Sequence, residues 1–350
     1  MPVALLLQMG GCILLSLIRD QADGLRRLLG KGGLRVLRLN SGRRGMGKTS
    51  VAVNLAAAMV AKGREVLILD ENATPGNVGD NLGQRARRDL LQVLRGECSL
   101  DQAIHRVAGI SILAAARGLS ELKQLPHDAR LALGDALAKA CPQYDVVIID
   151  SMAGTGSVLL PLALAAQEEL LVVSGSVAGI TDAYAFIKAT AGEYGKRRYR
   201  VLMSRIRNQP QAQAMFDNMA GAAQRYLGIE LELMGMIPFD EKLKRASSLG
   251  QSLLAAFPDA PAAATFRQLG LAVTEWPRTA DSNGDMSGFL HGLIRCAAVQ
   301  LSGSEGGQGA NSASTAARFA PRKAAQVHSA IDSRRGFQNS MGLQQGFVAV

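Results

Sequence analysis

A glycine-rich run near the start of the chain has the composition of a phosphate-binding loop. Residues 42–49 read Gly-Arg-Arg-Gly-Met-Gly-Lys-Thr, a complete G-x-x-x-x-G-K-T spacing. Glycines let successive backbone N–H groups close on phosphate oxygens, and a helix opening at Lys48 would add partial positive charge. Lys48 would reach the terminal phosphates and the Thr49 hydroxyl would bind Mg²⁺. The predicted nucleotide contacts are Gly42, Arg43, Arg44, Gly45, Met46, Gly47, Lys48, Thr49 and Ser50.

Two further carboxylates stand at the ends of apolar runs. Residues 65–69 lead into Asp70, and residues 144–149 lead into Asp150, which small residues follow. Because the carboxyl ends of parallel strands meet at one edge of a sheet, both carboxylates should lie beside the phosphate loop. Such aspartates hold Mg²⁺ and sense the γ-phosphate in this class of site. We therefore predict that Asp150 and Thr49 hold the metal and that Lys48, Asp70 and Asp150 serve catalysis.

The elements that must position these groups follow from the alternation of short apolar runs with longer amphipathic ones over residues 34–276. This pattern predicts an α/β fold, a doubly wound and mainly parallel sheet of the P-loop NTPase type. Predicted strands are Leu34–Leu39, Glu65–Leu69, Ile110–Leu113, Tyr144–Ile149, Leu170–Val173, Arg200–Met203 and Glu232–Met236. Predicted helices are Lys48–Lys62, Asp128–Ala140, Thr181–Tyr194, Gln211–Tyr226 and Ala260–Thr274.

The chain continues on both sides of this predicted domain. Residues 1–33 form an N-terminal extension whose first 18 residues carry no charge, but the polar stretch Gln8–Gly11 interrupts the apolar pattern and argues against a membrane span. Residues 277–350 are rich in Gly, Ser, Ala and Gln, which predicts a mostly disordered tail. Within the tail, apolar residues recur at helical spacing over Met286–Val299, which predicts a short amphipathic helix.

Composition narrows the function classes. Four cysteines in 350 residues form no CxxC pair, which argues against a disulfide framework and a zinc site and fits a reducing cytoplasm. The formal charge of +10 is compatible with an acidic partner such as nucleic acid or an anionic membrane. The densest basic run, residues 196–200, is better interpreted as a solvated helix end leading into a strand than as a nucleic-acid patch.

With these residues in place, the chain resembles the MinD/ParA family of P-loop ATPases over nearly all of residues 34–276. That family has an extra lysine two residues after the serine that opens its phosphate loop, and Ser41-Gly42-Arg43 aligns with this signature. The resemblance implies ATP and Mg²⁺ as cofactors and an ATP-dependent homodimer in which the signature side chain contacts the partner's nucleotide. It also implies that Asp182 lies on the surface used for partners.

A second resemblance points to the FlhG (FleN) branch of that family. The stretch Asp20–Leu28 is similar to the branch's N-terminal motif for stimulating the flagellar GTPase FlhF, and Ala255–Ala262 strengthens the likeness. It implies regulation of flagellar number or placement, with flagellar switch or transcriptional regulator proteins as partners. It also implies a cytoplasmic protein that binds the inner face of the membrane weakly. The partner-binding residues implied are Asp20, Gln21, Ala22, Gly24, Leu25 and Arg26.

Three departures from the family pattern bear on chemistry. The signature lysine is Arg43 and the next residue is Arg44 instead of glycine, although guanidinium groups also bind phosphate. Asn72 stands where the family has a second aspartate, so we expect slow hydrolysis. Ser204 replaces the asparagine of the adenine-recognising pair while Arg205 is retained. The resemblance implies that Ser204, Arg205 and Pro238 contact the base.

Three other functions remain open. A chromosome- or plasmid-partition ATPase would use the positive charge for DNA, but the motif at Asp20–Leu28 makes DNA an improbable partner. A scaffold that binds nucleotide without turnover fits Asn72. A reductase subunit would hold an iron–sulfur cluster, but its relatives place cysteine where this chain has Ala153, so Cys98 and Cys141 are better interpreted as buried thiols.

Overall fold

The computed structural model describes residues 34–72, 76–122, 144–154, 168–276 and 288. Eight strands form one sheet in the order β3-β4-β2-β5-β1-β6-β7-β8. All neighbours pair in parallel except β3 and β4, which are antiparallel. The strands are β1 (Arg35–Asn40), β2 (Val66–Asp70), β3 (His105–Val107), β4 (Ile110–Ala114), β5 (Val146–Asp150), β6 (Glu168–Ser174), β7 (Arg198–Ile206) and β8 (Glu230–Pro238).

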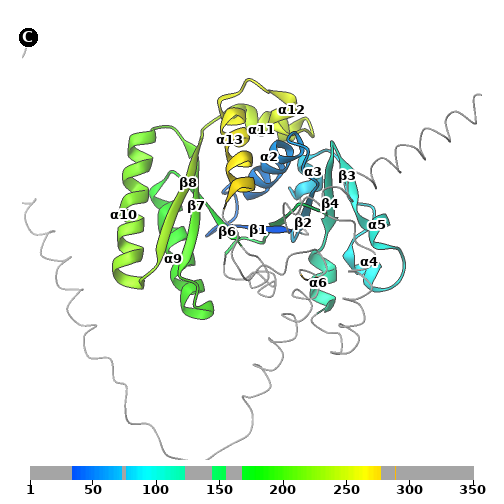
Figure 1. Cartoon of the computed structure of the whole chain (residues 1–350), viewed down its shortest axis with the longest axis horizontal. Helices are drawn as coiled ribbons and strands as arrows, with labels where there is room; N and C mark the ends of the chain where they lie inside the picture. Colours follow the sequence, from blue (N-terminus) through cyan, green and yellow to red (C-terminus); the bar gives the residue numbers. More distant parts are fainter. Residues whose placement is uncertain (1–33, 73–75, 123–143, 155–167, 277–287, 289–350) are drawn as a thin grey trace, which may run out of the picture. The chain divides into compact units, whose positions relative to one another are not determined.

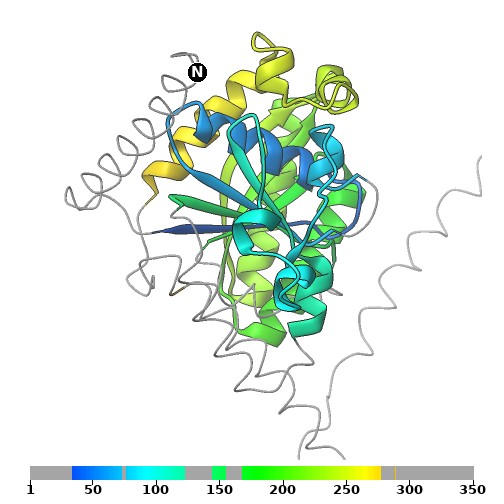
Figure 2. The same cartoon turned by 90° about the vertical axis from the view of Figure 1, so that its right-hand side faces the viewer.

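Helices cover both faces of the sheet (Figures 1 and 2). On one face lie α2 (Lys48–Val60), α3 (Val78–Asn81), α11 (Glu241–Ser248), α12 (Leu253–Ala256) and α13 (Pro261–Glu275). On the opposite face, α9 (Val177–Tyr194) and α10 (Gln209–Leu227) pack under β6 to β8. The short helices α4 (Leu90–Leu94), α5 (Leu100–Ala103) and α6 (Ala116–Leu122) pack under the β2 half. The sheet is therefore the middle layer, as the doubly wound fold predicts.

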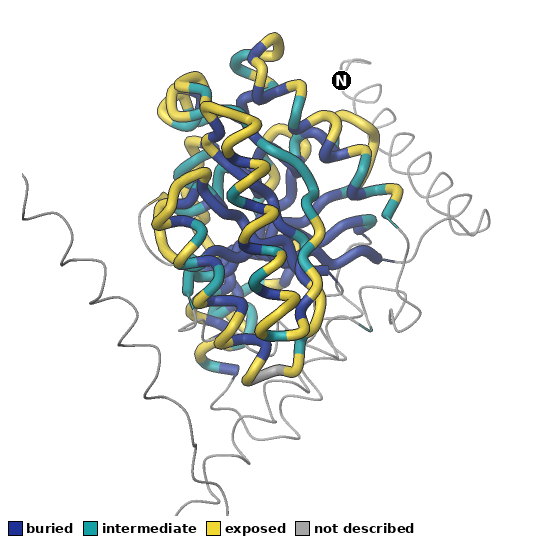
Figure 3. The backbone as a smooth tube through the Cα atoms, turned by 90° about the vertical axis from the view of Figure 1, so that its left-hand side faces the viewer, coloured by how far each residue is buried: buried dark blue, intermediate teal, exposed yellow. Residues whose placement is uncertain are grey.

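The central strands are buried along their whole length because both of their faces are covered, and the buried charges of β1 and β6 pair with each other, Arg35 with Glu168 and Arg38 with Glu169. Every residue of β1, β2, β5 and β6 is buried, while the outer faces of the helices are exposed (Figure 3). The helices α2 and α13 touch closely at Gly270, where an added Cβ would lie 2.9 Å from the Ala58 Cβ. A glycine is required at this crossing, and the packing brings α13 over the helix that follows the phosphate loop.

All seven predicted strands are confirmed, and four of the five predicted helices are present with shifted ends. The fifth, Asp128–Ala140, lies outside the described residues. Helix α9 begins before the predicted Thr181 because the Ser176 side chain caps it by accepting the Gly179 N–H. The sequence pattern missed β3, whose three residues form the antiparallel edge of the sheet and are too few to show a period. Gly228 ends α10 in the left-handed conformation.

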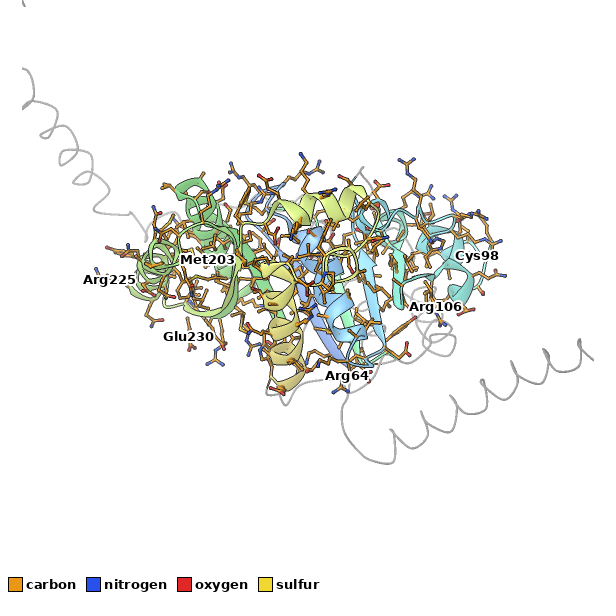
Figure 4. The ribbon with its side chains drawn as sticks, turned by 90° about the horizontal axis from the view of Figure 1, so that it is seen from above. Arg64, Cys98, Arg106, Met203, Arg225 and Glu230 are labelled. Atoms are coloured by element: carbon orange, nitrogen blue, oxygen red, sulfur yellow. The ribbon has the colours of Figure 1, made fainter. Side chains whose placement is uncertain are left out.

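The basic run at residues 196–200 is paired within the fold. Lys196 lies 2.7 Å from Glu169, and although burial favours protonation of that carboxyl, Lys196 and Arg38 outweigh it and lower the pKa of Glu169. Arg198 pairs with Glu230, at the β8 end of the sheet (Figure 4), and Arg200 pairs with acidic side chains of β6 and β8. The structural interpretation of this run is therefore favoured over a nucleic-acid patch.

Within the described residues, no helix is long and apolar enough to cross a membrane.

Candidate nucleotide-binding site

The glycine-rich loop lies between β1 and α2, at the carboxyl edge of the sheet, as predicted. Gly45 and Gly47 adopt φ values of 80° and 91°, a left-handed conformation that glycine accepts without strain. Gly42 packs so closely on α9 that an added Cβ would lie 2.4 Å from the Asp182 carbonyl oxygen. The loop borders a cleft of about 320 Å³, which residues 44–50 line together with Asn72, Asn81 and Arg205. Its backbone is therefore arranged for phosphate, with one wall set by α9.

The Asp150 carboxylate lies at the centre of the site and is fully buried. The Thr49 hydroxyl donates to Asp150 Oδ2 at 2.7 Å, and the Asn72 amide donates to the same oxygen at 3.0 Å. Lys48 Nζ lies 3.8 Å from Oδ1, which has no hydrogen-bond partner among the described residues. Burial raises the pKa of Asp150, and Lys48, Thr49 and Asn72 oppose that shift. The carboxylate thus retains capacity for a cation.

These groups fit Mg²⁺. The ion prefers hard oxygen ligands and is usually held by one or two protein groups together with water and substrate phosphates. The Thr49 hydroxyl and the Asp150 oxygen without a hydrogen-bond partner offer that donor set beside the phosphate loop, and their role as metal ligands stays a prediction. Bound there, the ion would neutralise phosphate charge.

The Asp70 carboxylate is used mainly for loop geometry. Its Oδ2 accepts the Val78 N–H at 2.8 Å, and its Oδ1 accepts the Asn72 N–H at 2.9 Å. Burial and the neighbouring Asp150 raise the pKa of Asp70 to about 6. The catalytic role of Asp70 stays a prediction, whereas the structure shows that this carboxylate fixes the start of α3.

Glu71 and Asn72 point to different sides of the strand end, as expected for adjacent residues. The Asn72 amide bridges the two aspartates, donating to Asp70 Oδ1 at 3.1 Å and to Asp150. Glu71 instead accepts the Met152 N–H at 3.1 Å, and burial raises its pKa to about 7. Asn72 is therefore the residue of this pair that faces the predicted metal position.

Arg43, which was expected to contact nucleotide, and Asp182, which was expected to contact a partner, instead contact each other. Arg43 Nε lies 3.0 Å from Asp182 Oδ2, and the two side chains are 51% and 34% exposed. Ion pairs this exposed contribute little, about 0–1 kcal/mol, so the pair can open at small cost. Arg44, rather than Arg43, lines the phosphate-side cleft. Arg43 is thus held away from the cleft in this state by α9.

The three residues expected at the base do gather in one place. Ser204, Arg205 and Pro238 line a second cleft of about 1150 Å³ that adjoins the phosphate loop and has α11 as its far wall. The Ser204 hydroxyl lies within 3.3 Å of the Met46 carbonyl oxygen and is buried, so it is directed into the protein. Arg205 has a φ of 59°, a conformation uncommon for a residue with a side chain. Ser204 therefore does not offer the base the side-chain contact that the family's asparagine makes.

Sequence reasoning missed the residues that connect the two clefts. Asn81 lines both, and α11 contributes seven residues to the base-side cleft. Asn81 lies in α3, which has four residues, and α11 has eight, so neither helix is long enough to give a clear periodic signal in the sequence.

The remaining predicted sites are not brought to this cleft. Asp20–Leu28 lies outside the described residues, as does Met286–Val299 apart from position 288. In the described part of the chain, no group of three or more His, Cys, Asp or Glu side chains could hold a metal by itself. Cys98 lies at the β3 end of the molecule (Figure 4), and Cys141 is outside the described residues. The described residues offer the iron–sulfur alternative no ligand set.

Comparison with known proteins agrees with this geometry. Residues 35–196 match the family described as an AAA domain. The antiactivator FleN of Pseudomonas aeruginosa is 32% identical to this chain over 263 residues, which cover 75% of this chain and 94% of FleN. The flagellum site-determining protein YlxH of Helicobacter pylori is 24% identical, over 61% of this chain and 73% of YlxH.

A solved structure gives the same fold. The septum site-determining protein MinD of Pyrococcus horikoshii, complexed with Mg-ADP, matches with a TM-score of 0.53 at 22% identity. The match covers 69% of this chain and 96% of that one. This chain therefore has the same fold as that protein.

Replacing Asn72 tests the bridge between the aspartates. Asn72→Asp would exchange an amide that donates to Asp70 and Asp150 for a third carboxylate. We expect the free energy of unfolding in magnesium-free buffer at pH 7.5 to fall by about 1–3 kcal/mol, because donors are lost and like charges meet. Urea denaturation with a chelator present measures this loss.

The control is Asn72→Ala, which removes the donors without adding charge. It should lose less stability, and Mg²⁺ should restore stability only in the Asp variant. An Asp variant as stable as the wild type without Mg²⁺ would show that Asn72 does not bridge the carboxylates.

Proposed function

The chain belongs to the MinD/ParA family of P-loop ATPases, and we propose that it is a nucleotide-dependent switch that regulates the number or placement of flagella. The observation that carries this proposal is the likeness to the antiactivator FleN along almost the whole of that protein. The flagellar description of YlxH points the same way. The structure supports this proposal, since the buried Asp150 lies against Lys48 and Thr49, beside the cleft that the phosphate loop lines.

ATP with Mg²⁺ is the proposed ligand. The loop backbone and Lys48 would hold the phosphates, while Thr49 and Asp150 would hold the metal. The Mg-ADP in the MinD structure supports this choice. The base would lie in the adjoining cleft beside Arg205 and Pro238.

The proposed consequence of nucleotide binding is a change of partner. Arg43 is half exposed and paired only at the surface with Asp182, so a phosphate or a second subunit could draw it away. We expect ATP to favour a homodimer and a partner-binding state, and weak membrane contact would come from residues 286–299 in each subunit. Vesicle co-sedimentation with ATP that is unchanged by deleting residues 286–299 would remove the membrane part.

The Lys48→Ala variant tests the nucleotide site. Without the ammonium group, the loop loses the charge that reaches the terminal phosphates, so ATP binding should be abolished. Titration calorimetry with Mg-ATP measures the affinity. Lys62→Ala, an exposed lysine at the far end of α2, is the matched control and should leave affinity unchanged. Equal affinity in wild type and Lys48→Ala would sink the nucleotide proposal.

Slow turnover follows from Asn72. An amide can orient water but supplies no useful basicity, and loss of a positioned base typically costs about 10²–10⁴-fold in rate. Phosphoryl transfer also depends on positioned charged and polar groups. The Asn72 amide already donates its hydrogen bonds to Asp70 and Asp150. We propose that the ATP state persists until a partner completes the site.

Steady-state hydrolysis measures this. Asn72→Asp should raise the basal rate by up to about 10²-fold. Asn77→Asp, which keeps an oxygen at the cap of α3, is the control and should not raise it. If the wild type without partner hydrolyses ATP as fast as Asn72→Asp, position 72 does not limit turnover.

A nucleotide-binding scaffold without turnover is the second candidate, and Asn72 is the observation that favours it. No hydrolysis by the wild type or by Asn72→Asp, together with intact ATP binding, would favour the scaffold. A partition ATPase gains less support, because Lys196, Arg198 and Arg200 of the basic run are paired with acidic side chains.

The flagellar assignment is tested through residues 20–28. A peptide of this sequence should stimulate GTP hydrolysis by FlhF, because it matches the branch's activating motif. The same peptide with Gly24 and Arg26 replaced by alanine is the control. No change in the GTPase rate at saturating peptide would count decisively against FlhF as a partner.

A further inference from the structure

A hydrogen bond joins two helices that border different parts of the nucleotide cleft. The Ser247 hydroxyl of α11 donates to Asn81 Oδ1 of α3 at 2.7 Å. Both side chains are partly buried, and the residues are far apart in sequence. Asn81 lines the phosphate-side cleft as well as the base-side cleft. The bond is therefore a direct link between the two halves of the site.

On the phosphate side, α3 is fixed to the strand-end carboxylate. The Val78 N–H donates to Asp70 Oδ2 at 2.8 Å, and Asp70 also holds Asn72. Asn81 Nδ2 donates to the carbonyl oxygens of Gly76 and Asn77, at 3.0 and 2.9 Å. The Asn81 amide thus uses its nitrogen within the α3 segment and its oxygen toward α11. A displacement of Asn81 would be transmitted to the segment that begins at Asp70.

On the base side, α11 is the wall of the cleft, and its end touches the α3 segment. An added Cβ on Gly250 would lie 2.8 Å from the Gly83 Cα, so the two backbones are in contact. Both glycines also have φ near +67°. A side chain at either position would therefore meet both the neighbouring backbone and a backbone conformation that favours glycine. The backbone contact and the Ser247–Asn81 bond together leave α11 little freedom to move without α3.

A second hydrogen bond holds the same wall to the phosphate loop helix. The buried Asn54 of α2 accepts the Leu253 N–H at 2.7 Å and donates to the Ser50 carbonyl oxygen at 2.8 Å. This bond anchors the chain after α11 at a fixed point. Beside the Gly250–Gly83 backbone contact, the Ser247–Asn81 bond is the side-chain hydrogen bond that joins α11 to α3 among the described residues.

We infer that Asn81 and Ser247 are positioning residues that couple occupancy of the base cleft to the placement of Asp70 and Asn72. The inference deepens the proposed function and rests on nucleotide binding at this cleft. A base lying against α11 would steady that helix, and the Ser247–Asn81 bond would steady α3. The base of the nucleotide would thereby order the carboxylate and amide beside the γ-phosphate, without touching either.

Hydrogen exchange with two ligands tests this coupling. Saturating Mg-AMPPNP fills both halves of the cleft, whereas saturating magnesium tripolyphosphate fills only the phosphate half. In the wild type, AMPPNP should slow exchange in the peptide 76–84 more than tripolyphosphate does, while both slow the peptide 45–50. Ser247→Ala should cut the extra slowing by roughly 2- to 12-fold, the range that one hydrogen bond accounts for.

Matched variants separate positioning from general destabilisation. Ser120→Ala removes an exposed hydroxyl of α6 that lines neither cleft and donates to the Ala116 carbonyl oxygen of its own helix at 3.2 Å, and this variant should behave as wild type. Ser247→Thr keeps a hydroxyl and should retain the extra slowing. Asn81→Ala should reproduce Ser247→Ala, and melting temperatures confirm that each variant is folded.

The outcomes are distinct. An undiminished difference between AMPPNP and tripolyphosphate in folded Ser247→Ala or Asn81→Ala overturns the coupling and leaves the nucleotide site intact. Equal slowing at 76–84 by both ligands in the wild type also overturns it. No slowing at 45–50 with either ligand in the wild type instead contradicts nucleotide binding, and the coupling falls with it.

Discussion

The buried carboxylate of Asp150 is the constraint on which the rest of the site depends. An ionised carboxylate removed from water must be compensated by donors or a cation, and its neighbours are arranged for that purpose. Lys48 and Thr49 approach it from the start of α2, and Asn72 approaches it from the end of β2. The sheet order makes this convergence unavoidable, because β5 lies between β1 and β2.

Two departures from the family pattern, Asn72 and Arg43, share one physical effect in this structure. Asn72 compensates the two aspartates by donating hydrogen bonds, where a third carboxylate would need a metal or protons. Arg43 is compensated at the surface by Asp182. Both substitutions therefore stabilise the site through contacts within one chain. Nucleotide and partner must then displace those contacts before the proposed switch can act. This requirement is consistent with the slow ATP turnover that we propose.

Much of this was accessible from the sequence because it is encoded locally. The apolar runs of the seven predicted strands, the glycines of the loop and the aspartates at strand ends each lie within a few residues. What could not be predicted depends on contacts between distant residues. The hydrogen bond from the Val78 N–H to Asp70, the Arg43–Asp182 pair and the Ser247–Asn81 bond all arise from tertiary packing. The orientation of the Ser204 hydroxyl into the protein also depends on neighbours that the chain brings from elsewhere.

We propose that nucleotide state controls assembly through this site. Sedimentation velocity in the presence of Mg²⁺ tests it most directly, with the full chain in ATP and in ADP. We expect a species of about twice the chain mass of 36.9 kDa with ATP and a species of 36.9 kDa with ADP. The same mass in both nucleotides, at concentrations where calorimetry shows the site saturated, would contradict a nucleotide-controlled switch.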